Sequence, residues 1–260
     1  MYGAIIGDII GSSYEMADPP IKTIDFELFT DKSTYTDDTV LTTAIAEAVI
    51  NQWDYLGAMH KYGRNHPGRG YNGRFQRWLF TDPPKSYESY GNDCAMRAVP
   101  IGFAYGSIES VMREAERSAL PTHNHPEGIK GAQAVALATY LAGMDYTKED
   151  IRKQIADRFG YDMQRTCDEI RPNYRFDVSC QGTVPEAIIA FLDSEDWESA
   201  VRLSISLGGN TDTMACITGG IAQAFYGQIP LWIKDEAWKR LTPPFQRVIE
   251  EFNEVFGVKM

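Results

Sequence analysis

Apolar residues recur along most of the chain at helical spacing, three or four positions apart. Ile45, Val49 and Ile50 follow this spacing, and it returns in "GAQAVALATYLAG" (131–143), "TVPEAIIAFLDS" (183–194) and "WESAVRLSISLGG" (197–209). Such spacing places the apolar side chains on one face of an α-helix. The alternation of apolar and polar residues that would indicate strands is nearly absent. The pattern therefore predicts an all-α fold.

Glycine, proline and polar residues interrupt the helical pattern at several places. These are "EMADPPIK" (15–22), "GRNHPGRGYNGR" (63–74), "FTDPPKSYES" (80–89), "THNHPEGIK" (122–130) and "IRPNYRFDVSCQG" (170–182). Each segment is short enough to be a loop within one domain, and no shift in composition marks a linker. We therefore expect residues 1–260 to form one compact, single-domain helical bundle.

Two of the predicted helices are unusually rich in small residues. They are "GAQAVALA", which starts at Gly131, and "MACITGGIAQA", which starts at Met214. Small side chains let helix axes approach closely, so we expect both helices to be central and tightly packed.

Composition narrows the class of partner. The chain has 43% hydrophobic and 12% aromatic residues, enough for a substantial core. Its 36 acidic residues against 25 basic ones give a formal net charge of −11. This charge disfavours nucleic-acid backbones and anionic membrane surfaces, and the sequence shows no basic patch that would reverse the effect.

The cysteines and the N-terminus indicate a reducing compartment. The four cysteines are widely spaced, without a C-x-x-C pair or the dense framework of a small secreted domain. The first residues lack a basic region, and Asp8 interrupts their apolar run, so we expect no signal peptide. No uncharged stretch approaches the roughly 20 residues that span a bilayer. A cytoplasmic protein fits these features best.

Two similar clusters of threonine and aspartate stand directly before apolar helices, at "TDDTVL" (36–41) and "NTDTMA" (210–215). Taken singly, each is explained by helix capping, because Asp and Thr side chains accept hydrogen bonds from the first turn. If the two helices lie side by side, however, their oxygen-bearing side chains converge. That set comprises Thr36, Asp37, Asp38, Asn210, Asp212 and Thr213.

Such a set favours a hard divalent cation. Carboxylate, hydroxyl and amide oxygens suit Mg²⁺ or Mn²⁺, whereas zinc would call for His or Cys ligands. Several carboxylates crowded together also need a cation to offset their repulsion. For the pair of clusters, we therefore expect a metal site.

Three further polar segments are weaker candidates. On spacing alone, His123 in "THNHPEG" is as consistent with a local hydrogen bond as with a ligand contact. The Gly91–Asn92 turn before an apolar helix offers backbone N–H groups to an anion such as phosphate, although most such turns are only turns. Glu15 follows the first buried helix and by itself reads as a solvated loop carboxylate.

Together these segments resemble the ADP-ribosylglycohydrolase family, which includes dinitrogenase reductase activating glycohydrolase and the ADP-ribosylarginine and ADP-ribosylserine hydrolases. The resemblance is carried, in the family's order, by "GAIIGDIIGSSYE", "YTDDTVLTTAIAEA", "GNDCAMRAVPIG", "THNHPEGIKGAQAVALA" and "LGGNTDTMACITGGIAQAFYG". It spans residues 3–227. It implies an all-helical domain whose central cleft holds two Mg²⁺ or Mn²⁺ ions.

The resemblance also implies the reaction and its partners. The expected activity is hydrolysis of the glycosidic bond that joins ADP-ribose to a protein or small-molecule acceptor, with free ADP-ribose as product. By position, Thr36, Asp37 and Asp38 match the family's first group of metal ligands, and Asp212 and Thr213 match the second.

The remaining matches concern the substrate. Gly91, Asn92 and Asp93 match the turn that receives the diphosphate and the adjacent ribose, and His123 matches a histidine that lines the cleft. Glu15 matches an acidic residue that approaches the metal and the scissile ribose in some members. Glu15 and Asp38 are therefore our candidates for orienting or deprotonating the attacking water.

The chain departs from the family pattern at two positions. Asn210 stands where the family commonly has Asp, so one charge of the metal site is missing, although the amide carbonyl can still bind a cation. Asp93 replaces the second glycine of the phosphate-binding turn, where an inward-pointing carboxylate would repel a diphosphate. Either Asp93 turns away or the turn contributes less than in relatives.

The sequence leaves the substrate linkage open. The net charge of −11 favours a cationic arginine acceptor over a polyanionic polymer, so mono-ADP-ribosylarginine is the preferred substrate. Serine-linked ADP-ribose is the alternative, because the resemblance places Glu15 where some O-linkage hydrolases of the family keep a carboxylate. Two other readings are a catalytically silent ADP-ribose-binding relative and a metal-dependent phosphoesterase, which also uses oxygen-ligated metal pairs.

Overall fold

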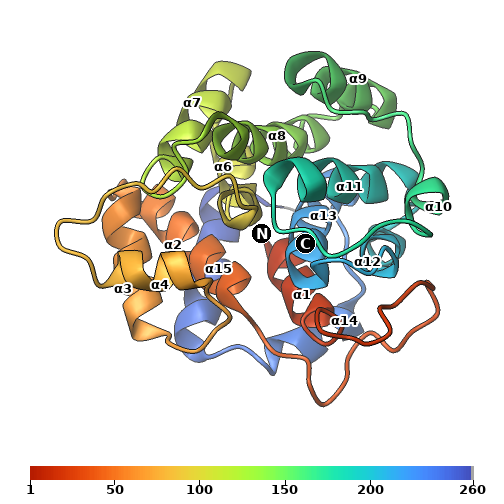
Figure 1. The fold of residues 1–260 in the computed structure, drawn as a ribbon, viewed down its shortest axis with the longest axis horizontal. Helices are drawn as coiled ribbons and strands as arrows, with labels where there is room; N and C mark the ends of the chain where they lie inside the picture. The colour runs from red at the N-terminus through yellow and green to blue at the C-terminus, as the bar shows by residue number, and fades with distance from the viewer. Residues whose placement is uncertain (259–260) are drawn as a thin grey trace.

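A computed structural model describes residues 1–258, which form helices joined by loops (Figure 1). The helices are α1 (Tyr2–Gly11), α2 (Asp37–Asn51), α3 (Tyr55–Asn65), α4 (Gly73–Leu79), α5 (Asp93–Met96), α6 (Val99–Ala104), α7 (Ile108–Ala119), α8 (Pro126–Gly143), α9 (Lys148–Phe159), α10 (Cys167–Ile170), α11 (Cys180–Asp193), α12 (Trp197–Ser206), α13 (Thr211–Tyr226), α14 (Leu231–Trp238) and α15 (Pro243–Val255). Within the described part of the chain, β-structure is limited to one isolated bridge between Gly91 and Ser179. The all-α prediction is confirmed.

The centre of the molecule is α13, as the small residues predicted. Nearly all of this helix is buried, and it packs against α1, α8, α11 and α12. In Figure 1 it lies near the middle of the view, with α1 beside it, α8 and α11 above, α12 to one side and α2 to the other. The second small-residue helix, α8, is also largely buried.

The contact between α1 and α13 is exceptionally close. A Cβ atom at Gly7 of α1 would lie 2.0 Å from the carbonyl oxygen of Ala215, and one at Gly3 would lie 2.1 Å from that of Gly219. Real Cβ atoms do not come this close to an oxygen, so only glycine allows this approach. These glycines were not among the residues predicted from the sequence to matter. They fix the position of Asp8, which follows Gly7, relative to α13.

Several helices begin earlier than their apolar pattern indicated. The interruption at 122–130 contains the first turn of α8, because Pro126 is tolerated at the start of a helix. The interruption at 170–182 contains the start of α11, where the Ser179 hydroxyl accepts a hydrogen bond from the Gly182 N–H and caps the helix. A helix that begins with a polar first turn is hard to distinguish from a loop in the sequence, because capping residues also occur in loops.

None of the helices in residues 1–258 is both long enough and apolar enough to cross a membrane.

Candidate active site

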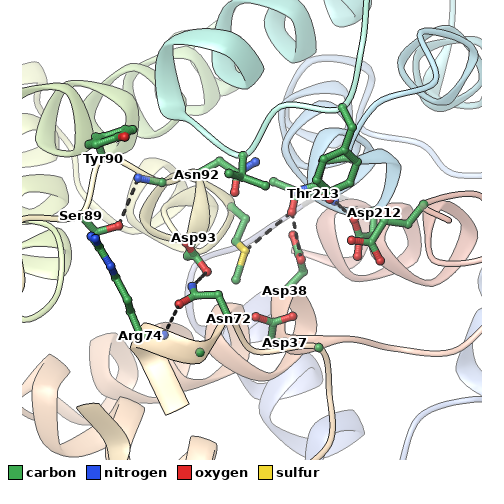
Figure 2. Close-up of a pocket in the computed structure, with 18 of the residues that line it drawn as sticks. Asp37, Asp38, Asn72, Arg74, Ser89, Tyr90, Asn92, Asp93, Asp212 and Thr213 are labelled. Carbon is green, nitrogen blue, oxygen red and sulfur yellow. Dashed lines mark hydrogen bonds between the residues drawn. The ribbon is translucent and has the colours of Figure 1, made fainter. Parts of the chain in front are cut away.

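A pocket of about 510 Å³ opens where α2, α5 and α13 begin. Its wall is acidic at one end, where the carboxylates of Glu15, Asp37, Asp38 and Asp212 gather. Figure 2 shows Asp37, Asp38, Asp212 and Thr213 at this end, and Arg74, Ser89 and Tyr90 at the other. The pocket is therefore polarised along its length. The two Thr/Asp clusters meet in space, although Asp38 and Thr213 are 175 positions apart.

Asp8 lies beneath the acidic end and ties α1 to the start of α2. It is fully buried, and its carboxylate accepts hydrogen bonds from the backbone N–H and the hydroxyl of both Thr36 and Thr39. Three of these bonds end on Oδ2 and one on Oδ1, so most of the carboxylate's acceptor positions, about four in all, are used. Asp8 thus positions the first Thr/Asp cluster. It also lies close to two carboxylates that could bind a metal, Asp38 and Asp212.

Three carboxylates lie close together at the acidic end of the pocket. Asp8, Asp38 and Asp212 each place an oxygen within 4.8 Å of the other two, and all three are buried. The Thr213 hydroxyl donates to Asp38 Oδ2 at 3.2 Å, which links the second cluster directly to the first. Thr36 donates to Asp8 and Asp38, and it is not part of the pocket wall.

Two buried oxygens in this cluster lack any partner. Asp38 Oδ1 and Asn210 Oδ1 are inaccessible to solvent and accept no hydrogen bond. Buried polar atoms in proteins are almost always paired with protein groups or water, so we expect a water or a ligand at these oxygens. Capping does not account for them, because Thr36 caps α2 and Asn210 makes no side-chain cap on α13. Two unpartnered oxygens beside a cluster of carboxylates are suitable ligands for a hard cation such as Mg²⁺.

The pKa values of the clustered carboxylates also favour a bound cation. Burial raises the pKa of Asp37, Asp38 and Asp212 well above the ordinary aspartate value, and the charges of neighbouring carboxylates raise it further. The set is therefore unfavourable as bare anions. A bound cation would remove that cost, because its charge dominates the local field.

Asp37 and Glu15 flank the cluster on the pocket wall. Asp37 is 9% exposed, and its backbone N–H donates to the Arg69 carbonyl, so it is held by the loop before α4. Glu15 is half-buried, four residues beyond the end of α1. Burial raises the pKa of Glu15, and the charge of Asp8 adds to the effect.

The Gly91–Asp93 turn forms the middle of the pocket wall. Asn92 is anchored from beneath, since its Nδ2 donates to Thr183 Oγ1 at 3.0 Å and its backbone N–H donates to the Val178 carbonyl at 2.8 Å. The Asp93 carboxylate is engaged sideways, with Oδ1 accepting from Asn72 Nδ2 at 2.7 Å (Figure 2). Of the two possibilities for Asp93, that it turns away or that the turn contributes less, the structure shows the first, because the carboxylate is bonded to Asn72.

His123 lies behind this turn and not on the pocket wall. It is fully buried, its Nδ1 is 2.6 Å from the Thr122 hydroxyl, and its Nε2 is 3.6 Å from Asp93 Oδ2. Burial acts to raise the pKa of Asp93, but the contact with His123 and the hydrogen bond from Asn72 outweigh it and lower the pKa. His123 therefore helps keep Asp93 ionised and in place.

The opposite end of the pocket carries two cations, Arg74 and Arg77 of α4. Neither was predicted from the sequence as a site residue, and Arg74 fell in the predicted loop at 63–74. Figure 2 shows the Arg74 side chain extending along the wall toward Ser89. Both guanidinium groups are exposed, and neither has a carboxylate within 4.0 Å among the residues described. Their charge is thus available to an anion in the pocket.

Asp8 was likewise not proposed as a site residue, although the sequence contains a signal for it. It is the one charged residue in "YGAIIGDIIG", a helix that is buried on every side. A carboxylate in such a helix must find hydrogen-bond donors, which places another polar segment against it. Arg74 has no comparable signal, because its role depends on where α4 lies in space.

The family model described as ADP-ribosylglycohydrolase matches residues 1–257. The protein belongs to the ADP-ribosylglycohydrolase family. Among relatives of this family member, ADP-ribosylhydrolase ARH3 of Homo sapiens is 28% identical over 322 aligned residues, which cover 92% of this chain and 86% of that protein. ADP-ribosylarginine hydrolase Tri1 of Pseudomonas putida (strain GB-1) is 24% identical, with 92% of this chain and 74% of that protein covered.

A solved structure described as an ADP-ribosylglycohydrolase-related protein complex has the same fold as this family member. The two superpose with a TM-score of 0.72, covering 99% of this chain and 95% of the other, at 23% sequence identity. The ADP-ribosylglycohydrolase fold expected from the sequence is thereby confirmed.

Proposed function

We propose that this protein hydrolyses the glycosidic bond between ADP-ribose and a modified acceptor. The observation that carries the proposal is the polarity of this pocket, with unpartnered carboxylate and amide oxygens at one end and two arginines at the other. ADP-ribose has the matching order of groups, with a ribose at its reacting end and a diphosphate farther along. The names of the relatives, an ADP-ribosylhydrolase and an ADP-ribosylarginine hydrolase, support this substrate class.

The proposed cofactor is a pair of divalent cations, Mg²⁺ or Mn²⁺. Asp38, Asp212 and Asn210 would hold them, with Asp37 and the Thr36 and Thr213 hydroxyls completing the donor set, while Asp8 keeps Thr36 and Asp38 in place. When bound, such cations lower the pKa of water and bind the hydroxyl groups of a ribose.

The protein's own residues have distinct roles in this proposal. Glu15 and Asp38 orient the attacking water and accept its proton, and the raised pKa of Glu15 makes its carboxylate a better base at neutral pH. The remaining carboxylates stabilise positive charge that develops on the ribose as the acceptor leaves. Asn92 and the Gly91–Asp93 turn line the part of the pocket that receives the ribose and diphosphate, with Asp93 held away from the phosphates by Asn72.

Incubation of the purified protein with an ADP-ribosylated peptide and Mg²⁺ tests this function. Release of free ADP-ribose is the expected result. Binding of ADP-ribose without turnover would instead make the protein a silent relative, and cleavage at the diphosphate would make it a phosphoesterase.

We propose arginine as the acceptor, and the name of Tri1 supports that choice. A guanidinium group is drawn to the acidic end of the pocket, where Glu15 and Asp37 flank the cluster. The comparison to make is kcat/KM on arginine-linked and serine-linked peptides of one sequence, since that ratio reports differential transition-state binding. A preference for the serine linkage would overturn arginine and leave the rest of the proposal standing.

We also propose that the protein acts in the cytoplasm. All four cysteines are unpaired thiols, which suits a reducing compartment.

Asn210→Asp should tighten the binding of Mg²⁺, because the new carboxylate adds a negative charge at an oxygen that already lacks a partner. We expect an increase in affinity of about tenfold, equivalent to about 1.4 kcal/mol. Isothermal titration calorimetry on the metal-stripped protein measures it. Asn65→Asp, at an exposed position at the end of α3, adds the same charge away from the pocket and should leave the affinity unchanged. An unchanged affinity in Asn210→Asp would mean that Asn210 does not bind the metal.

Arg74→Ala should weaken substrate binding through the diphosphate. A hydrogen bond to a charged group contributes about 1.5–3 kcal/mol, so we expect KM to rise by about tenfold or more with kcat nearly unchanged. KM should also become less sensitive to salt, because a screened attraction has been removed. Arg247→Ala removes the same charge from an exposed position on α15 and serves as the control. Equal changes in both variants would assign the effect to net charge.

A further inference from the structure

Two cysteine thiols lie in contact directly behind the Gly91–Asp93 turn. The Sγ atoms of Cys94 and Cys180 are 3.8 Å apart, and both side chains are fully buried. Cys94 belongs to α5, and Cys180 is the first residue of α11. Cys167 and Cys216 are also buried, but no other pair of sulfurs from cysteine comes into contact among residues 1–258.

Both sulfurs face the same small space. Cys180 Sγ is 3.0 Å from the Gly91 carbonyl oxygen, and Cys94 Sγ is 3.1 Å from that of Gly128. Cys94 Sγ is also within 3.6 Å of the Gly91 carbonyl. The Gly91 carbonyl is thus in reach of both thiols.

The surroundings of this pair favour a thiolate. The Arg97 guanidinium is fully buried, with Nη2 bonded to the Ser118 carbonyl and the Thr122 hydroxyl, while Nε and Nη1 have no partner. A buried cation of this kind needs a nearby anion. Burial opposes ionisation of Cys94, but the Cys180 hydrogen bond and the charges of His123 and Arg97 lower its pKa overall, even though Asp93 acts in the opposite direction.

We propose that Cys94 and Cys180 form a site of reversible oxidation, at which a small peroxide converts the two thiols into a disulfide. The Cys94 thiolate attacks one peroxide oxygen, the O–O bond breaks, and hydroxide leaves a sulfenic acid on Cys94. The Cys180 thiol then attacks the Cys94 sulfur, and the hydroxyl group leaves with the Cys180 proton as water. The two thiols together lose two electrons, and hydrogen peroxide becomes two waters.

The geometry allows the second step with a modest movement. A disulfide bond is about 2.05 Å long, so the sulfurs must approach by a little under 2 Å. Gly131 of α8 faces Cys180, and a Cβ there would lie 2.4 Å from the Cys180 sulfur, so a side chain at this position would block the space. Burial keeps bulky disulfides such as glutathione away from both sulfurs, so the oxidant of this proposal is a small peroxide.

Oxidation has a predictable effect on the pocket. The disulfide removes the Cys180 S–H donor that holds the Gly91 carbonyl, and it pulls α5 toward α11. The turn is also tied to this region by the bond from the Cys180 N–H to the Tyr90 carbonyl at 2.8 Å. The turn should therefore shift, and ADP-ribose should bind less well. Disulfide formation itself goes beyond the proposed function; only the effect on ADP-ribose binding rests on it.

The test treats the full-length protein with hydrogen peroxide and counts free thiols after denaturation. Two of the four thiols should be lost, and digestion without reductant should give one linked pair of peptides, containing Cys94 and Cys180. Dithiothreitol should restore both thiols. Cys180→Ala should abolish the link, whereas Cys167→Ala, which removes a buried cysteine outside the pair, should retain it.

The wild-type peptide map decides the proposal without any variant. Retention of all four thiols, while an exposed cysteine in a reference protein oxidises completely, would overturn it, as would a link through Cys167 or Cys216. Calorimetric titration with ADP-ribose then measures the effect on the pocket. Weaker binding after oxidation, reversed by dithiothreitol and missing in Cys180→Ala, is expected if the proposed function also holds. A formed disulfide with no ADP-ribose binding in either redox state would leave the oxidation site standing and remove the proposed function.

Discussion

Asp38→Asn is expected to reduce kcat/KM by about a thousandfold or more, which corresponds to about 4 kcal/mol of lost transition-state stabilisation. Asp38 carries a buried, unpartnered oxygen and shares hydrogen bonds with both Thr/Asp clusters. Asparagine keeps the size of the side chain and removes its charge, so the loss would come from the cation site. Steady-state hydrolysis of an ADP-ribosylated peptide measures it.

Folding stability separates this role from helix capping. If Asp38 serves the cation site, Asp38→Asn relieves repulsion, and the metal-free variant should melt at the same or a higher temperature than metal-free wild type. A capping residue behaves in the opposite way, because its loss costs about 0.5–2 kcal/mol. Thr36→Ala, which removes the hydroxyl that caps α2, provides that comparison. An active but less stable Asp38→Asn protein would show that Asp38 is only structural.

Mg²⁺ should raise the melting temperature strongly at about pH 8 and only slightly at about pH 5, and removal of the metal should abolish turnover. In the folded chain the pKa values of Asp37, Asp38 and Asp212 are raised above those of the unfolded chain. The folded state therefore holds protons that the unfolded state has released. Without metal, the contribution of these three groups to stability is complete below the unfolded-state pKa of about 4 and is lost as pH rises through the raised values.

Scanning fluorimetry with chelator or with Mg²⁺, repeated across the pH range, measures this linkage. Metal and protons compete for the same oxygens, so the stabilisation by Mg²⁺ grows as the protons leave. Asp212→Asn should lose most of the Mg²⁺ effect at high pH. Identical melting temperatures with chelator and with Mg²⁺ at both pH values, together with full activity in chelator, would exclude a metal requirement.

The parts of the site that could be predicted from sequence are those written into short segments. Asp37 and Asp38 stand next to each other before an apolar helix, and Asp212 stands in a similar context, so their convergence required only that α2 and α13 begin near one another. The all-α class was predictable for the same reason, since it depends on local periodicity.

Other parts depend on long-range geometry that no short segment encodes. His123 was matched to the cleft, but whether its ring faces the pocket or the protein depends on how the end of α7 meets the Gly91–Asp93 turn, and the structure places it behind Asp93. Arg74 reaches the pocket only because α4 is packed beside it. The sulfur contact between Cys94 and Cys180 likewise joins residues 86 positions apart.

The glycine contact between α1 and α13 determines how changes outside the pocket wall would damage this protein. A Cβ at Gly11 would lie 2.3 Å from the Thr211 carbonyl oxygen and 2.6 Å from the Cα of Asp212. A single methyl group there would force the two axes apart. Helices are stiff, so the displacement would reach Asp8 and Asp212 almost undiminished. Mg²⁺ demands ligands at about 2.0–2.1 Å, which leaves little tolerance for such an error. Catalysis can therefore be lost through a residue that touches neither metal nor substrate, and a screen confined to pocket residues would overlook that class of inactivating change.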